Sequence, residues 1–131
     1  QGTSRNFVIL GGTGAVSKTV ENQLKAMGTV TRVKGASRYE TSVEIAKRYF
    51  LTPSAAVLAY AQGFPAGLCG GPLALSIGAP LILTSNESSA LADDYVVGIT
   101  TGAVTGGTAR ISDETVRNIF DLPANTPIVK P

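Results

Sequence analysis

Short aliphatic runs alternate along the chain with segments in which apolar residues recur every three or four positions. Each run is bounded by glycine, proline or polar turn residues, as is typical of strands. These runs lie at 7–10, 30–33, 56–59, 81–83 and 102–105. Alternating strands and helices predict an α/β domain: a small doubly wound, mostly parallel sheet with helices on both faces, of the Rossmann-like kind.

The helical segments carry recognisable ends. Ser17 is placed to cap a helix that ends at Gly28, and Ser112 to cap the last helix. Apolar spacing predicts three further helices, at 39–50, 72–77 and 89–97. The middle one is expected to be short, with proline at its start and glycine just after its end.

A stretch near the start of the chain recurs 95 positions later. GGTGAVS at 11–17 aligns without a gap on GGTARIS at 106–112. Because 131 residues are less than two such periods, we expect one full repeat over 30–122, followed by a tail at 123–131. Residues 1–29 are expected to be the closing strand and helix of a preceding repeat, folding with the rest, which implies a tandem array cut on its N-terminal side.

The residue types present restrict the possible chemistry. Histidine is absent and Cys69 is the single cysteine, which excludes Ser-His-Asp and Cys-His catalysis, an intrachain disulfide and most transition-metal sites. Cys69 is expected to be a small buried residue in apolar surroundings. Any remaining chemistry would have to use carboxylates, lysine, tyrosine or a bound cofactor. No apolar run is long enough to span a membrane.

Charge is distributed unevenly along the chain. The net charge of +2 does not indicate a nucleic-acid partner. Residues 1–50 nevertheless contain eight Lys and Arg against three acids, and no cation lies between Tyr49 and Ala109. Two interpretations are open: an ordinary solvated helix surface, which is favoured, and a basic surface for an anionic partner.

The glycine-rich segment after the first strand has two interpretations. Gly11, Gly12 and Gly14 lie between a strand and a helix, where dinucleotide-binding domains hold a pyrophosphate. The third glycine of that fingerprint is replaced by Ser17, and the second copy keeps the turn and the serine but has Ala109 in place of Gly14. A tight turn with a capping serine is favoured, and NADP-like binding by Gly11, Gly12 and Gly14 is the alternative.

Four blocks in fixed order resemble the type 2 cell wall binding repeat (CWB2-like) of Gram-positive surface proteins. They are GASRYET at 35–41, QGFPAGLCGGPLA at 62–74, GAPLILT at 78–84, and the repeated turn at 106–112. The resemblance covers about residues 30–122, while residues 7–27 resemble the closing block of a preceding repeat. The sequence departs from the family at Ala66, where Asp normally follows Phe-Pro.

The resemblance implies a non-catalytic anchoring module, with no enzyme activity, no cofactor and no metal. Such a module is extracellular and is held at the cell wall of a Gram-positive bacterium by an anionic polymer of the teichoic or lipoteichoic kind. It also implies sister repeats as partners, usually in a three-fold arrangement. The family's signature segment corresponds to Pro80, Leu81, Ile82 and Leu83, and its most regular arginine to Arg38. With Arg32 and Lys34, these are the candidate polymer-binding residues, although Leu81, Ile82 and Leu83 fit a buried parallel strand equally well. A pure assembly module without affinity for a polymer is a third possibility.

Overall fold

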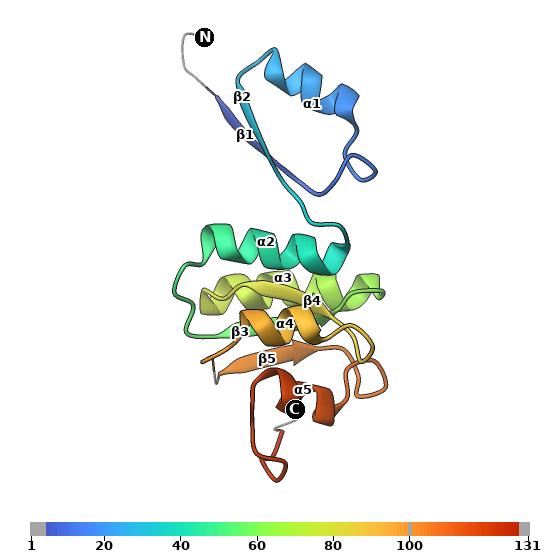
Figure 1. Cartoon of the computed structure of the whole chain (residues 1–131), viewed down its shortest axis with the longest axis vertical. Coiled ribbons are helices and arrows are strands. Elements are labelled where there is room, and N and C mark those ends of the chain that lie inside the picture. The colour runs from blue at the N-terminus through green and yellow to red at the C-terminus, as the bar shows by residue number, and fades with distance from the viewer. Residues whose placement is uncertain (1–4, 100, 129–131) are drawn as a thin grey trace.

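The computed structural model describes residues 5–99 and 101–128. Strands and helices alternate through these residues, and every strand pair is parallel, which confirms the predicted α/β class (Figure 1). The strands form two sheets. One pairs β1 (Asn6–Leu10) with β2 (Thr29–Val33), and the other has the order β4 (Leu81–Thr84), β3 (Ala56–Tyr60), β5 (Gly102–Thr105).

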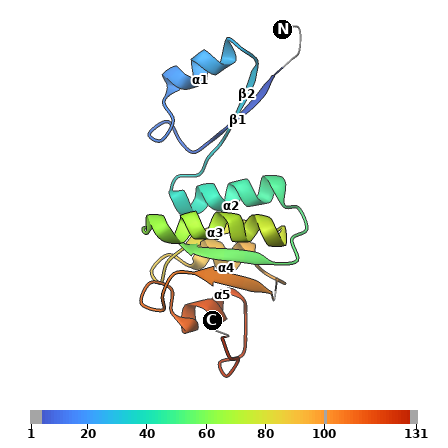
Figure 2. The same ribbon diagram turned by 180° about the vertical axis from the view of Figure 1, so that it is seen from behind.

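The first sheet belongs to an N-terminal part, residues 6–33, which stands away from the remainder of the molecule (Figures 1 and 2). The helix α1 (Lys18–Lys25) connects its two strands and lies on the face that carries the paired residues Ile9 and Arg32. On the other face Val8 and Leu10 are 43% and 50% exposed. One face of this sheet is therefore left without a covering helix among the described residues.

The expected single sheet is divided because the helix α2 (Arg38–Tyr49) occupies the outer edge of β4. The Ser42 hydroxyl accepts a hydrogen bond from the backbone N–H of Leu83, 3.0 Å away, and donates to the Tyr39 carbonyl at 2.8 Å. This uses a hydrogen-bonding group that a strand beside β4 would need. β2 pairs with β1 instead, and residues 34–37 carry the chain from one sheet to the other.

Helices cover both faces of the three-stranded sheet, as predicted. On one face α3 (Phe64–Ile77) packs through Ala74 against Val57 and Ala103. On the other face α2, α4 (Ala90–Tyr95) and α5 (Asp113–Ile119) enclose the larger core around Leu58 and Ile82. None of the helices among the described residues is long and apolar enough to cross a membrane.

The helix α3 is longer than the predicted segment 72–77, and it includes Pro72 in its interior. Its low helix propensity is offset by close packing on the sheet, because a Cβ at Gly70 would lie 2.8 Å from Cδ1 of Leu81. The expectation that Cys69 is buried was wrong. Cys69 is exposed, because the face of α3 that meets the sheet is formed by its neighbour Gly70 and by Ala74.

The 95-residue repeat is present in the structure as well as in the sequence. Gly11 and Gly106 both have positive φ, 108° and 118°, which favours glycine in each turn. The capping serines also correspond: Ser17 accepts from the N–H of Val20 at the start of α1, and Ser112 accepts from the N–H of Thr115 at the start of α5. The turn and the cap that follow β1 thus match those that follow β5.

Candidate functional site

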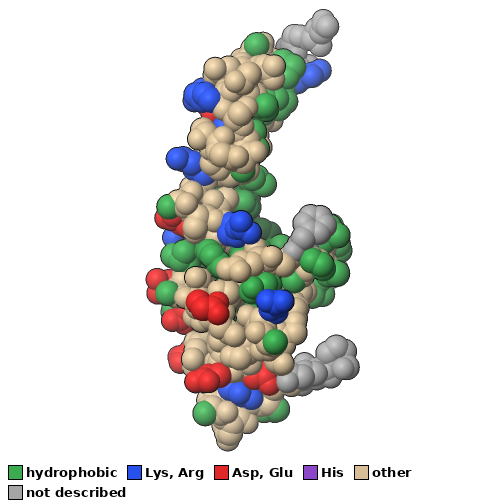
Figure 3. All heavy atoms as spheres, turned by 90° about the vertical axis from the view of Figure 1, so that its right-hand side faces the viewer, with side chains coloured by type: hydrophobic (Ala, Val, Ile, Leu, Met, Phe, Trp, Pro, Cys, Tyr) green, Lys and Arg blue, Asp and Glu red, His purple; other side chains and the backbone are tan. Residues whose placement is uncertain are grey.

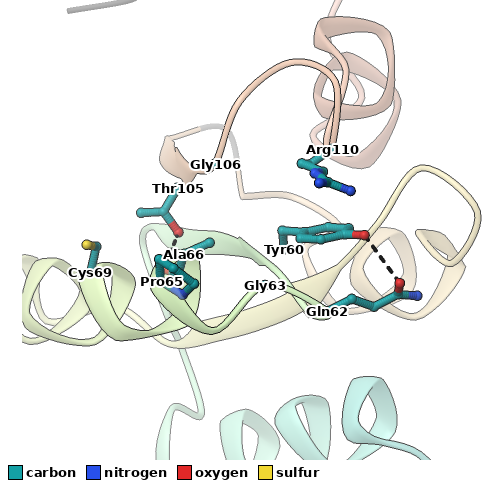
Figure 4. Close-up of a pocket in the computed structure, with 9 residues that line it drawn as sticks. All are labelled: Tyr60, Gln62, Gly63, Pro65, Ala66, Cys69, Thr105, Gly106 and Arg110. Carbon is teal, nitrogen blue, oxygen red and sulfur yellow. Dashed lines mark hydrogen bonds between the residues drawn. The ribbon is translucent and has the colours of Figure 1, made fainter.

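A pocket of about 590 Å³ opens at the carboxyl edge of the three-stranded sheet, between β3 and β5. The chain leaves β3 toward α3 on one face and leaves β5 toward α5 on the other. Such a point of divergence leaves a crevice that α/β proteins use for ligands. The pocket is lined by Tyr60, Gln62, Gly63, Pro65, Ala66, Cys69, Thr105, Gly106 and Arg110 (Figure 4).

Arg110 and Tyr60 form the charged side of this pocket. The Arg110 guanidinium carbon lies 5.2 Å from the centroid of the Tyr60 ring, which places the cation over the aromatic face. The Tyr60 hydroxyl donates to Oε1 of Gln62 at 3.3 Å (Figure 4). Arg110 itself is exposed, so its N–H groups are available to an anion.

The start of α3 faces the same pocket. Gly63 is the residue before the helix and provides no side-chain cap, and Pro65 follows in the first turn. The Thr105 hydroxyl donates to the carbonyl of Ala66 at 2.9 Å and so fixes this turn against β5 (Figure 4). Because backbone N–H groups at a helix start carry partial positive charge, α3 adds to the field of Arg110.

A second pocket, of about 460 Å³, continues from the first and shares Tyr60, Gln62 and Gly63 with it. Its cation is Arg38, the first residue of α2, whose Nη1 donates to the Ala61 carbonyl at 2.9 Å. We call the two pockets together the groove. None of the residues lining the groove is acidic, so Arg38 and Arg110 give it a positive charge.

The predicted site residues are not all brought together. Arg32 lies in the N-terminal part, where Nε and Nη2 bond to Glu21 Oε2 at 3.1 and 3.0 Å and Nη1 donates to the Gly11 carbonyl at 2.8 Å. Glu21 also binds Lys18 and Lys25, and hydrogen bonds from Lys18, Lys25 and Arg32 lower the pKa of Glu21 to about 2. Arg32 is thus occupied by an ion-pair cluster, whereas Lys34 is exposed on the connection to α2.

The predicted proline-aliphatic segment forms β4 and the turn before it. Pro80 and Ile82 are fully buried, while Leu81 and Leu83 are partly buried. Leu83 lines the groove beside Arg38. Pro80 and Leu81 lie at the amino end of β4, away from the carboxyl edge of the sheet where the groove opens.

The glycines of the alternative nucleotide site line a third pocket of about 470 Å³, which shares Arg38 and Leu83 with the groove and includes residues of the turn before α2. Gly11, Gly12 and Gly14 are all among the lining residues. The start of α1 is already capped by Ser17, and the carbonyl of Gly11 accepts from Arg32. The conformation of Gly11 is repeated at Gly106, as a turn-forming role requires.

Tyr60, Gln62 and Arg110 were missed as a group by sequence analysis. Tyr60 ends a strand, and Gln62 belongs to a block of the family resemblance, but neither position indicated a contact with Arg110. One signal was available: in the repeated turn, Arg110 takes the position of Ala15. The second turn keeps the first two glycines and the serine but carries an arginine that the first turn lacks, so the two turns differ in what they can contact.

Comparison with known proteins agrees with this fold. LytC, an N-acetylmuramoyl-L-alanine amidase of Bacillus subtilis (strain 168), is 37% identical over 127 residues, which are 92% of this chain and 25% of LytC. The amidase enhancer of the same organism is 38% identical over 82 residues, which are 63% of this chain and 12% of that protein. The solved structure of Cwp8 from Clostridium difficile matches with a TM-score of 0.71 and 30% identity, over 90% of this chain and 20% of that chain.

The chain therefore spans a quarter or less of each of these relatives. A family model described as Cell wall binding domain 2 (CWB2) matches residues 32–116, well over half of the chain. That match covers β3, α3, β4 and β5 and all the residues of the groove, and it confirms the resemblance inferred from the sequence blocks. The chain belongs to the cell wall binding domain 2 (CWB2) family.

Proposed function

We propose that this chain is a non-catalytic module that attaches a protein to the outside of a Gram-positive cell by binding an anionic wall polymer, of the teichoic or lipoteichoic kind, in the groove. The observation that carries the proposal is the position of Arg110 over Tyr60, next to the uncapped start of α3. Family membership supports the cell wall as the partner.

The groove suits a polymer of repeated phosphate and sugar units. Arg110 and Arg38 are guanidinium groups that can each donate two hydrogen bonds to a phosphate. Tyr60 and Gln62 lie between them and offer an aromatic edge and an amide to a neighbouring sugar. Lys34 precedes Arg38 by four residues on an exposed connection and extends the line of cations.

The other predicted site residues have supporting roles in this proposal. Arg32 holds the N-terminal part together through Glu21. Pro80, Leu81 and Ile82 hold β4 in the sheet, and Leu83 contributes to the wall of the groove. Changes in the buried segment would therefore weaken wall binding by deforming the groove.

The proposal assigns no catalysis to the groove. Histidine is absent from the chain, and no carboxylate lines the groove to act as a general acid or base. The activity named for LytC or for the amidase enhancer is therefore not assigned to this chain. The proposed contribution of this chain is retention at the wall.

The proposal includes sister repeats, packed in a three-fold arrangement. Residues 49–86 contain no charged residue, and α3 carries Leu68 and Leu75 at 63% and 84% exposure. An exposed apolar helix face of this kind is typical of a surface that packs against another protein. The outer face of α3 is thus the proposed contact between repeats.

Co-sedimentation with purified Gram-positive walls tests the proposal. Walls are used before and after removal of their anionic polymers, at low and at moderate salt. We expect the chain to pellet with intact walls at low salt and to remain in solution when the polymers are removed. Moderate salt should also release the chain, because it screens the attraction between the arginines and the polymer beyond about 10 Å. Pelleting that ignores both treatments contradicts the proposal.

A matched pair of variants locates the binding site. Arg110→Gln removes the cation over Tyr60, whereas Arg48→Gln removes a similar cation over Tyr49, 5.8 Å from its centroid, in the last turn of α2. We expect the first variant to lose retention and the second to keep it. Equal loss would indicate binding by net charge alone.

Cys69 provides a test without mutation. It is the single cysteine, it is exposed, and it lines the groove. Bound polymer should slow alkylation of this thiol. A thermal shift with NADP and unchanged alkylation by polymer would favour the nucleotide alternative, and concentration-dependent association without retention would favour the assembly module.

A further inference from the structure

A side-chain contact joins the loop after β4 to the end of the turn that carries Arg110. Oδ1 of Asn86 accepts from the backbone N–H of Ser112 at 2.8 Å and from the hydroxyl of Thr115 at 2.9 Å. These partners are 26 and 29 positions away in the sequence. One amide oxygen thus satisfies two donors at the start of α5, where backbone N–H groups lack partners within the helix.

The loop that carries Asn86 is closed directly after β4. Thr84 and Ser85, the two residues before Asn86, are buried at 0% and 1% exposure. The N–H of Ser88 donates to the carbonyl of Ser85, and the hydroxyl of Thr84 donates to the carbonyl of Ser88, both at 3.3 Å. Asn86 therefore offers its oxygen from a loop whose base is fixed in the core.

The turn 106–112 is loosely held at its start and tightly held at its end. Nothing lies within 4 Å of a Cβ at Gly107, and Arg110 donates its N–H at 2.9 Å to the carbonyl of that glycine, within the turn itself. At the other end, Ile111 is buried at 2% exposure and Ser112 bonds to the loop after β4. The position of Arg110 is thus set by the residues that follow it.

The corresponding turn 11–17 does not make this contact. Ser17 caps α1 as Ser112 caps α5, but no side chain among the described residues accepts from the backbone N–H of Ser17. Ala15 takes the position of Arg110 in that turn. The copy of the turn that carries the arginine is therefore the copy that is attached to a second loop.

The charge around Arg110 makes this attachment important for the groove. Residues 87–121 contain six acids and two arginines, Arg110 and Arg117. Figure 3 shows acidic side chains spread over the main body. In a mobile turn, Arg110 would be drawn toward these carboxylates and away from Tyr60, because opposite charges attract. A fixed turn keeps the cation at the groove.

We propose that Asn86 is a positioning residue of the groove, which holds Arg110 over Tyr60 by attaching the turn 106–112 to the loop after β4. Its effect on wall binding rests on the proposed function, but the position of Arg110 can be measured without any polymer. Both bonds use Oδ1, so Asn86→Asp keeps the acceptor and Asn86→Ala removes it. Asn86 is exposed, so neither change should unfold the chain.

NMR of the chain alone measures the position of Arg110. The ring of Tyr60 shifts the signals of protons that lie over its face upfield, and Tyr60→Leu gives the signals without the ring. We expect Asn86→Ala to move the Arg110 side-chain signals at least halfway to their values in Tyr60→Leu, and Asn86→Asp to leave them in place. Asn118→Ala, which removes an exposed amide from the last turn of α5, is the matched control and should also leave them in place.

Retention on intact walls measures the consequence. Asn86→Ala should lower retention about two- to tenfold, and it should cause no further loss in the Arg110→Gln chain, because both changes act on one contact. Losses that multiply in the double variant would overturn the inference, and so would Arg110 signals that stay in place in Asn86→Ala. If the unchanged chain is not retained, the proposed function fails, and the NMR comparison alone decides the inference.

Discussion

The hydroxyl of Ser42 and the backbone N–H of Leu83 form a hydrogen bond of 3.0 Å that attaches α2 to the outer edge of β4. This contact joins residues 41 positions apart and closes an edge that would otherwise accept a strand. It explains why the chain builds two sheets from an alternation that is compatible with one. It also places Arg38, at the start of the same helix, beside the loop after β3.

Ser42→Ala should destabilise the main body. The change leaves the N–H of Leu83 without its acceptor at a part-buried position, which costs about 1–3 kcal/mol of the free energy of unfolding. Urea denaturation followed by circular dichroism measures this. Ser76→Ala, in an exposed turn of α3 where the hydroxyl donates to Leu73, is the control and should have a much smaller effect. Equal losses would show that the edge contact does not contribute to stability.

The N-terminal part should lose stability in acid. The folded pKa of Glu21 is about 2, below its ordinary value of 4.5, so its contribution is fully present above about pH 4.5 and is lost as the pH falls toward 2. Hydrogen exchange of β2 across this range measures the change. Glu21→Gln should remove the pH dependence in this window, whereas Glu44→Gln, which breaks an exposed pair with Lys47, should leave it in place.

Gly102→Ala should be strongly destabilising. A Cβ at Gly102 would collide with the ring of Phe120 and lie 2.7 Å from the Ala56 carbonyl, so β3 and β5 could not keep their spacing. Overpacking of this kind costs about 1–3 kcal/mol. Gly107→Ala is the matched control, because nothing lies within 4 Å of a Cβ there. Thermal denaturation of the two variants gives the comparison, and a control as unstable as Gly102→Ala would contradict the explanation.

Ala66→Asp restores the residue that normally follows Phe-Pro in this family. A carboxylate in the first turn of α3 is favourable to the helix dipole by about 0.3–1 kcal/mol, so the melting temperature should rise. Because relatives carry Asp at this position, retention of the variant on intact walls should be at least as strong as that of the unchanged chain. Ala66→Asn, of similar size but neutral, is the control for the charge. Loss of retention with Asp but not with Asn would contradict this expectation.

Leu75→Lys tests the outer face of α3. Leu75 is 84% exposed, so a lysine is accommodated without loss of folding, but its charge should oppose contact between repeats. Analytical ultracentrifugation of the chain should show association that rises with concentration and is reduced in the variant. Val97→Lys, at a similar exposure of 80% after α4, is the control.

Strands and helix starts were predicted correctly where a single local pattern in the sequence specified them. The five strands of the described residues were all predicted because aliphatic runs ended at clear turn residues, and the serine caps of α1 and α5 were predicted from their chemistry. The first half of α3 was not predicted, because Pro72 was placed at the start of a short helix and the glycines before it have low helix propensity. Its stability comes from contacts with β3, β4 and β5, which are remote in sequence.

The candidate site was only partly predictable. Arg38 was identified from a motif, and the structure places it in the groove. Arg32 was identified from its charge, but Glu21 lies eleven residues earlier on the covering helix and binds it. The partnership of Arg110 with Tyr60 depends on β5 lying next to β3, which no local pattern in the sequence specifies.

The parallel pairing of β1 and β2 has a mechanical consequence. The chain enters the N-terminal part at the first residue of β1 and leaves it at the last residue of β2. Tension applied along the chain therefore pulls two parallel strands from opposite ends and loads all the hydrogen bonds between them at the same time. If the protein is tethered and pulled by flow, the force shears β1 against β2. Their backbone hydrogen bonds must then break together rather than one after another.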